Sequence, residues 1–182
     1  MANSFNVLLC LVLIAMVGCS PSAIPASKPS PDPSLQPRVA SKHSIVPGLG
    51  IDGCSVGDPK EDAIAMLGTP ASDESGYTEY PNHGIEFASD ENGRIKSLFM
   101  YYQMPDYTIF SGATKDGINA QSSVDDVLRI YGTPSRVGES TISQFGAKPG
   151  AIEKSLQYYG KGIVFTFWDG KLAYICVTRP AL

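Results

Sequence analysis

The side chains in this sequence that are best suited to chemistry are thiols and imidazoles. They are Cys10, Cys19, Cys54, Cys176, His43 and His83. Neither histidine has a cysteine or carboxylate neighbour at the spacing of a zinc site, and the acidic run 90–92 lacks the ligand pattern of a calcium loop. The sequence also contains no nucleophile elbow, phosphate-binding loop or dinucleotide fingerprint. We therefore expect no metal, no cofactor and no enzymatic activity.

Cys19 follows a short apolar segment. The run 7–17 has eleven residues, fewer than the roughly 20 that a membrane span needs, and this length is typical of a signal peptide. The phrase Met16-Val17-Gly18-Cys19 resembles a bacterial lipobox. That resemblance implies that residues 1–18 are a signal peptide that is removed, that Cys19 carries the lipid, and that Ser20 is compatible with sorting to the outer membrane. An ordinary secretory signal or a short uncleaved anchor is the alternative.

Residues 19–47 have the composition of a tether. Positions 20–47 contain seven prolines and seven serines among 28 residues. Such a segment buries too little apolar surface to offset the entropy lost on ordering, and frequent proline favours extended conformations. We expect a disordered link between the lipidated Cys19 and a globular part.

Two phrases recur in the same order along the globular part. "LGTP", which ends at Pro70, returns as "YGTP", which ends at Pro134. Each is followed by Gly-Ile-x-Phe, at 84–87 and at 162–165. Order and spacing favour an internal duplication over chance similarity.

Each repeat is expected to begin with a short helix. Asp58 before Pro59 has the pattern of a helix start, and Ser122 or Ser123 is expected to cap the second helix. Glycine in the left-handed conformation, with proline soon after it, ends a helix. The structural helix stops are Gly68, Pro70, Gly132 and Pro134.

Alternating apolar and polar segments after each stop predict hairpins, with turns at 90–93 and 169–170. Residues 137–155 have no counterpart in the first repeat, so a longer hairpin or a mobile loop is expected there. The predicted fold is α+β, with two tandem repeats at 48–112 and 113–182. In each repeat a short helix packs on a three- or four-stranded antiparallel sheet.

The phrase "VGDPKEDAIAMLGTP" at 56–70, followed by a hairpin, resembles the small outer-membrane lipoproteins of the BamE/SmpA/OmlA type. The positions that match are Gly57, Leu67, Gly68 and Pro70. This resemblance implies an accessory role in outer-membrane protein assembly. Two copies in tandem resemble instead the β-lactamase-inhibitory proteins. The shared motif is structural, so it implies a fold more directly than a function.

Charge is unevenly distributed between the two predicted repeats. Residues 48–112 carry eleven acidic and three basic side chains, and residues 113–182 carry six and eight. Nucleic-acid binders need a basic surface that neutralises phosphates, so we expect no nucleic-acid partner. The acidic part keeps the protein soluble or suits a basic partner.

Most aromatic side chains lie on the predicted strands. Phe87 and Phe165 occupy matched positions and are expected in the core. A candidate binding surface comprises Trp168, Tyr101 and Tyr158, with core packing as the alternative for each.

These observations predict a lipid-anchored protein of a bacterial cell envelope, at the outer membrane and facing the periplasm. Its partners are then the membrane, through the lipid, and another envelope protein. The expected role is an adaptor in outer-membrane protein assembly or envelope integrity. The alternative is a protein inhibitor or ligand-binding lipoprotein that uses a concave sheet face.

Cys54 and Cys176 remain once Cys10 leaves with the signal peptide and Cys19 is lipidated. Outside the cytoplasm they could form a disulfide that joins the two repeats. The alternative is a pair of unpaired buried thiols that pack as small apolar groups.

The lipid anchor gives the first testable prediction. Cys19→Ala should abolish acylation, because no other thiol follows the apolar segment directly, and it should release the protein or leave the precursor uncut. Metabolic labelling with a fatty-acid probe measures this. Equal labelling of the variant and the wild type would contradict the lipoprotein assignment.

Overall fold

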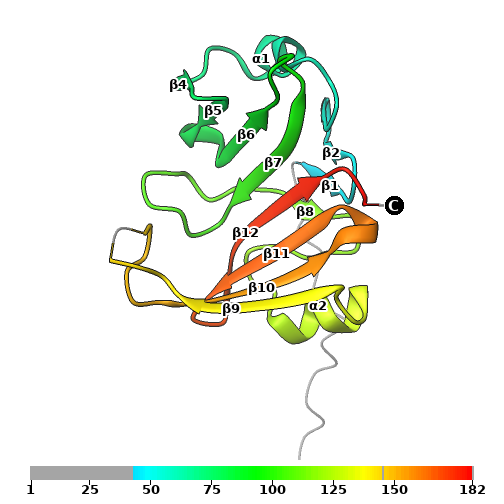
Figure 1. The fold of residues 1–182 in the computed structure, drawn as a ribbon, viewed down its shortest axis with the longest axis vertical. Coiled ribbons are helices and arrows are strands. Elements are labelled where there is room, and N and C mark those ends of the chain that lie inside the picture. Colours follow the sequence, from blue (N-terminus) through cyan, green and yellow to red (C-terminus); the bar gives the residue numbers. More distant parts are fainter. Residues whose placement is uncertain (1–42, 145, 182) are drawn as a thin grey trace, which may run out of the picture. The chain divides into compact units, whose positions relative to one another are not determined.

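The computed structural model describes residues 43–144 and 146–181 (Figure 1). The predicted signal peptide, Cys19 and most of the predicted tether lie outside the described residues.

The described residues form two helices, two 3-10 turns and twelve strands. The helices are α1 (Lys60–Leu67) and α2 (Val124–Tyr131), and the turns are Pro81–His83 and Tyr159–Lys161. The strands are β1 (Ser44–Val46), β2 (Gly50–Ile51), β3 (Cys54–Ser55), β4 (Ser72–Glu74), β5 (Tyr77–Tyr80), β6 (Ile85–Ser89), β7 (Ile95–Tyr101), β8 (Ala113–Thr114), β9 (Arg136–Thr141), β10 (Ile152–Tyr158), β11 (Ile163–Trp168) and β12 (Lys171–Thr178).

The strands belong to two sheets. The large sheet is antiparallel and has eight strands in the order β4-β5-β6-β7-β12-β11-β10-β9. The small sheet has the order β3-β2-β1-β8, and in it β1 runs parallel to β8. The predicted hairpins at 90–93 and 169–170 are present as β6–β7 and β11–β12, and residues 137–155 form most of the β9–β10 hairpin.

The expected α+β fold of two tandem repeats, each a helix on its own sheet, is wrong. The structure is mostly β, and the strands of 48–112 and 113–182 form one continuous sheet because β7 pairs with β12. The register runs from Tyr101 opposite Tyr174 to Ser97 opposite Thr178. Two separate sheets would each leave an edge strand with unpaired backbone groups, and this pairing satisfies them.

The fold also begins earlier than residue 48. Ser44–Val46 form β1, and Ile45 is fully buried opposite Ile51 and Thr114. The predicted tether therefore includes a short strand at its end. Burial of the apolar Ile45-Val46 pair is favourable, and this pair distinguishes the strand from the proline- and serine-rich residues before it.

A single main core lies between the helices and one face of the large sheet. Phe87 and Phe165 are fully buried in it, as predicted, together with Ala63 of α1 and Val127 and Tyr131 of α2. The Tyr131 ring meets the Phe165 ring edge-on at 4.9 Å between centroids. Aromatic pairs in this geometry add to the stabilisation that area burial gives.

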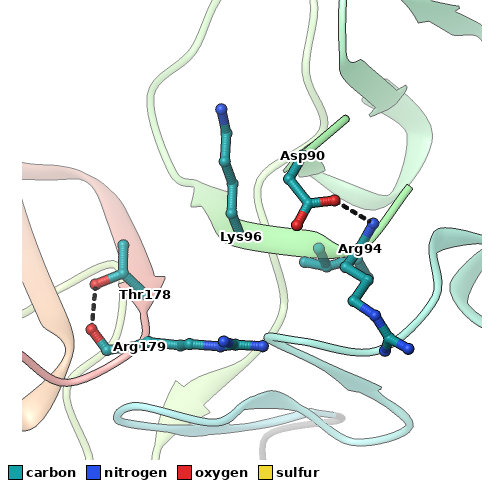
Figure 2. A pocket seen from close by; sticks show the side chains of 6 residues that line it. Asp90, Arg94, Lys96, Thr178 and Arg179 are labelled. Atoms are coloured by element: carbon teal, nitrogen blue, oxygen red, sulfur yellow. Dashed lines mark hydrogen bonds between the residues drawn. The ribbon is translucent and has the colours of Figure 1, made fainter. Parts of the chain in front are cut away.

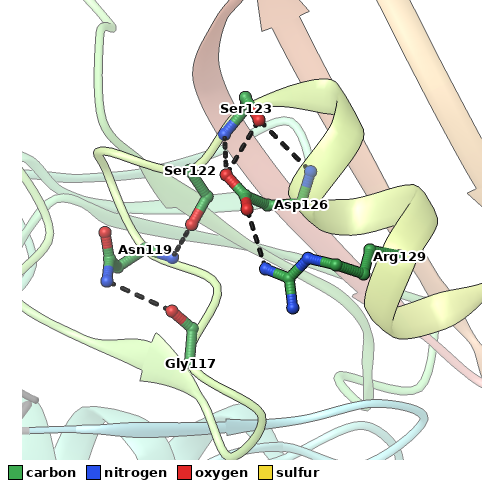
Figure 3. A network of polar contacts seen from close by, with 6 residues as sticks. All are labelled: Gly117, Asn119, Ser122, Ser123, Asp126 and Arg129. Atoms are coloured by element: carbon green, nitrogen blue, oxygen red, sulfur yellow. Dashed lines mark hydrogen bonds and ion pairs between the residues drawn. The ribbon is translucent and has the colours of Figure 1, made fainter. Parts of the chain in front are cut away.

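The two helices begin differently. Ser123 caps α2: its hydroxyl accepts from the Asp126 N–H, and the Asp126 carboxylate accepts from the Ser123 N–H (Figure 3). This hydrogen bond and the Arg129 guanidinium hold the pKa of Asp126 at about 2. The predicted cap at Asp58 is wrong, because its carboxylate accepts from the Ser55 N–H and Pro59 is the residue before α1.

Both helices end at glycine. Gly68 follows α1 with φ +88° and ψ −165°, and Gly132 follows α2 with φ +75° and ψ −154°. This combination of φ and ψ is essentially restricted to glycine. It differs from the left-handed helical conformation that the sequence suggested. A tyrosine hydroxyl donates to each glycine carbonyl at 2.8 Å, Tyr80 to Gly68 and Tyr158 to Gly132.

No atom lies within 4 Å of a Cβ added at either glycine, so a larger side chain would meet no steric clash there. The backbone conformation is therefore the reason that these positions need glycine. Gly68→Ala and Gly132→Ala should each lower the free energy of unfolding by about 1–3 kcal/mol, measured by urea titration. Gly160→Ala is the matched control. It also faces open space but has no positive φ, so it should change stability little. Equal stability of all three variants would contradict this account.

Candidate functional site

The large sheet has one face covered by α1 and α2 and one face that they leave uncovered, here called the open face. Successive side chains along each strand point to opposite faces of the sheet, so the residues between the core-facing ones point to the open face. Its aromatic side chains are Tyr77, Phe99, Tyr101, Trp168 and Tyr174. Its charged side chains are Glu74, Glu79, Glu86, Glu153, Arg136 and Lys171.

The three aromatic residues predicted as a binding surface do not lie together. Tyr158 is 3% exposed in the main core. Tyr101 and Trp168 belong to the open face but are only 5% and 3% exposed. Trp168 packs with Ala151 and Ala173 in a small second core, and its indole N–H donates to Glu153 at 3.1 Å. None of the three presents its ring fully to solvent.

The aromatic side chains of the open face form a continuous row across the β7–β12 join. Ring centroids are 6.3 Å apart for Trp168 and Tyr174, 5.8 Å for Tyr174 and Tyr101, and 4.7 Å for Tyr101 and Tyr107. Phe99 lies beside Tyr101 and Tyr174. Phe99, Tyr107 and Tyr174 are half-exposed, so they supply the accessible part of the row.

Glu86 on β6 is the polar centre of this surface. Its Oε2 accepts hydrogen bonds from the hydroxyls of Tyr101 at 3.2 Å and Tyr107 at 3.1 Å. Burial raises the pKa of Glu86, the two hydroxyls oppose that rise, and the neighbouring Glu79 adds to it. The register places Glu79 directly opposite Glu86, and like charges in this position destabilise a sheet.

Neither glutamate is neutralised by the described part of the chain. The ion pairs there join Lys60 to Asp73, Arg129 to Asp126, Lys148 to Asp169 and Lys154 to Glu139. No donor among the described residues is hydrogen-bonded to Oε1 of Glu86. The site can therefore accept further hydrogen bonds and positive charge.

A second feature is a hollow of about 290 Å³ between the start of β7 and the end of β12 (Figure 2). Its lining is Asp90, Arg94, Ile95, Lys96, Thr178 and Arg179. The Asp90 carboxylate accepts from the Asn92 and Arg94 N–H groups at 2.9 Å, so it organises the β6–β7 turn. Lys96 points away from Arg179 in Figure 2.

Both arginines of this hollow meet at Gly57. Arg94 Nη1 donates to the Gly57 carbonyl at 2.8 Å, and a Cβ on Gly57 would lie 2.6 Å from Arg179 Nη2. Gly57 also has φ +99°, which side chains rarely adopt. The hollow is thus a structural junction. Its contacts explain why position 57, which the sequence analysis singled out, is a glycine.

Cys54 and Cys176 are both free thiols, so the disulfide that the sequence allowed is not present. Cys54 packs in the main core, whereas Cys176 stands opposite Phe99 on the open face, and the sheet lies between them. Burial raises the pKa of each thiol to about 12. Each thiol therefore stays protonated at neutral pH.

Within residues 43–144 and 146–181, no group of three or more His, Cys, Asp or Glu side chains is placed to hold a metal ion. No helix in this part combines the length and apolarity that crossing a bilayer requires.

Sequence reasoning missed Glu79, Glu86 and Tyr107. The sequence pattern could have indicated the two glutamates. Glu79 comes directly before the core-facing Tyr80, and Glu86 directly before the core-facing Phe87, so each glutamate points to the other face. Their direct opposition depends on a register that the turn at Pro81–His83 sets. Tyr107 lies between β7 and β8, and no periodic pattern indicated its place.

No family model matches the chain, and no curated protein matches it. The crystal structure of YjgB, a DUF4309 family protein from Bacillus subtilis subsp. subtilis str. 168, is similar with a TM-score of 0.48 and 14% sequence identity. The similarity covers 72% of this chain and 88% of that one.

The raised pKa of Glu86 predicts a specific pH dependence. The folded protein holds this proton more tightly than the unfolded chain, so Glu86 lowers stability as pH rises from about 4 through its folded pKa. Glu86→Gln keeps an acceptor for the tyrosines and cannot ionise. Its free energy of unfolding relative to wild type should therefore rise between pH 4 and pH 7 in urea titrations.

Glu61→Gln, an exposed substitution on α1, is the control and should show no such gain. A Glu86→Gln difference that is constant or falls with pH would contradict the assignment.

Proposed function

We propose that this protein is a lipid-anchored, non-catalytic binding module of a bacterial cell envelope that holds a protein partner on its open face. The partly exposed rings of Phe99, Tyr107 and Tyr174 beside Glu86 carry the proposal. Exposed aromatic surface is costly in water, and aromatic residues are enriched where proteins bind one another.

The amino-terminal sequence supports the location. A short apolar run, the phrase Gly18-Cys19 and the proline- and serine-rich tether favour a lipid on Cys19 in the outer membrane, facing the periplasm. A lipid on a long tether would let the open face approach partners near the membrane.

The open face favours a protein over a small molecule. Binding sites for small molecules are usually enclosed concave cavities, whereas this surface consists of neighbouring strands with half-exposed side chains. The preferred role is an adaptor in outer-membrane protein assembly or envelope integrity. An inhibitor that captures a secreted enzyme would use the same face.

Site-specific photo-crosslinking in native membranes tests the proposal. A photoreactive amino acid in place of Phe99 should give a discrete crosslinked product in the full-length protein. The same amino acid in place of Arg129, exposed on α2, should not. The identity of the product distinguishes an assembly complex from a secreted enzyme. Identical products from both positions, or none from Phe99, would contradict binding at the open face.

A further inference from the structure

We infer that Glu79 and Glu86, with the partly exposed ring of Tyr107, bind a lysine or arginine side chain of a basic segment in the protein partner. This inference rests on the proposed function and specifies the chemistry of the partner.

The two glutamates bring uncompensated negative charge to the open face. Glu79 and Glu86 lie directly opposite each other on β5 and β6, and no cation of the described residues pairs with either. Two opposed carboxylates repel each other in the free protein. A cation placed between them would offset that repulsion, so binding gains more here than at a lone carboxylate.

The carboxylate of Glu86 is held in place before a ligand binds. The Tyr101 and Tyr107 hydroxyls both donate to Oε2 of Glu86, which fixes the carboxylate and leaves Oε1 for a ligand. The strand register and the half-buried position further restrict Glu86. A carboxylate that is already fixed loses little conformational freedom when it binds a ligand. Hydrogen bonds between charged groups are also stronger than those between neutral groups.

Aromatic rings lie beside the carboxylate of Glu86. The Tyr101 and Tyr107 rings are 4.7 Å apart at an interplanar angle of 66°, and Tyr174 is the next ring of the row. Aromatic faces attract ammonium and guanidinium groups, and guanidinium groups also stack on them. A carboxylate beside aromatic rings therefore suits a cationic side chain.

The charge of the whole open face agrees with this ligand. Its strands carry four acidic side chains, Glu74, Glu79, Glu86 and Glu153, and two basic side chains, Arg136 and Lys171. A surface of this sign steers basic partners toward it and repels nucleic acids and anionic lipid.

The binding test uses short probes and the intact protein. Acetylated and amidated Gly-Arg-Gly should shift the NMR signals of Glu86 and the Tyr107 ring, more strongly at low salt. The same peptide with neutral citrulline in place of arginine should not. Glu86→Gln should weaken the arginine peptide about fivefold or more, and Glu61→Gln should leave its affinity unchanged.

Loss of binding in Glu86→Gln cannot be assigned to unfolding if that variant is at least as stable as the wild type at pH 7. Equal shifts with the arginine and citrulline peptides, or equal affinity in wild type and Glu86→Gln, would overturn the cation site.

Crosslinking separates this failure from failure of the proposed function. With the photoreactive group at Phe99, the product should disappear in the Glu79→Gln/Glu86→Gln double variant and persist in Glu61→Gln. A product that persists in the double variant overturns the cation site and leaves open-face binding intact. Absence of the product without the glutamate substitutions contradicts the open face itself.

Discussion

The pairing of β7 with β12 is the constraint on which the rest of the structure depends. It joins two sets of four strands into one sheet, and it places Tyr101 opposite Tyr174 and Phe99 opposite Cys176. The connection continues past β7, where the Tyr102 N–H donates to the Ala173 carbonyl at 2.7 Å. Because the aromatic row crosses this join, neither set of strands alone contains the candidate site.

The helices determine which face remains available. Both pack on the same side of the sheet, and the tyrosine hydroxyls of β5 and β10 hold the carbonyls that end α1 and α2. With both helices placed there, the opposite face is covered in part, by the second core around Trp168 and by Tyr107 at Tyr101. Phe99 and Tyr174 stay partly exposed because the two short helices are anchored on the other side.

Local features of the sequence predicted local features of the structure. The ends of the helices at Gly68 and Gly132, the cap at Ser123 and the β11–β12 turn all depend on residues close together in the chain. The join of β7 to β12 could not be predicted in this way, since pairing between distant strands leaves no periodic signal. Asp58 shows a limit of local prediction, because its carboxylate could accept from an N–H of the following helix or from one before it, and it accepts from the Ser55 N–H.

The candidate site was less predictable than the fold for a related reason. Strand alternation indicates which side chains point away from the core. Their exposure on the open face depends on which loops cross that face. Trp168 was a reasonable anchor by residue type, yet residues near 142, 151 and 104 cover it. Phe99 and Tyr174, on the central pair of strands, stay half-exposed because no helix reaches their side.

The position of Glu86 links stability to the proposed function. A sheet optimised for stability alone would place a neutral or basic residue opposite Glu79, because cross-strand pairs of opposite charge stabilise antiparallel sheets. Here the two acids oppose each other on the face that the helices leave uncovered, and two tyrosines hold one of them in place. Local rules of stability are most often broken at sites of function. The unfavourable pair is therefore best explained by a cation that the partner supplies.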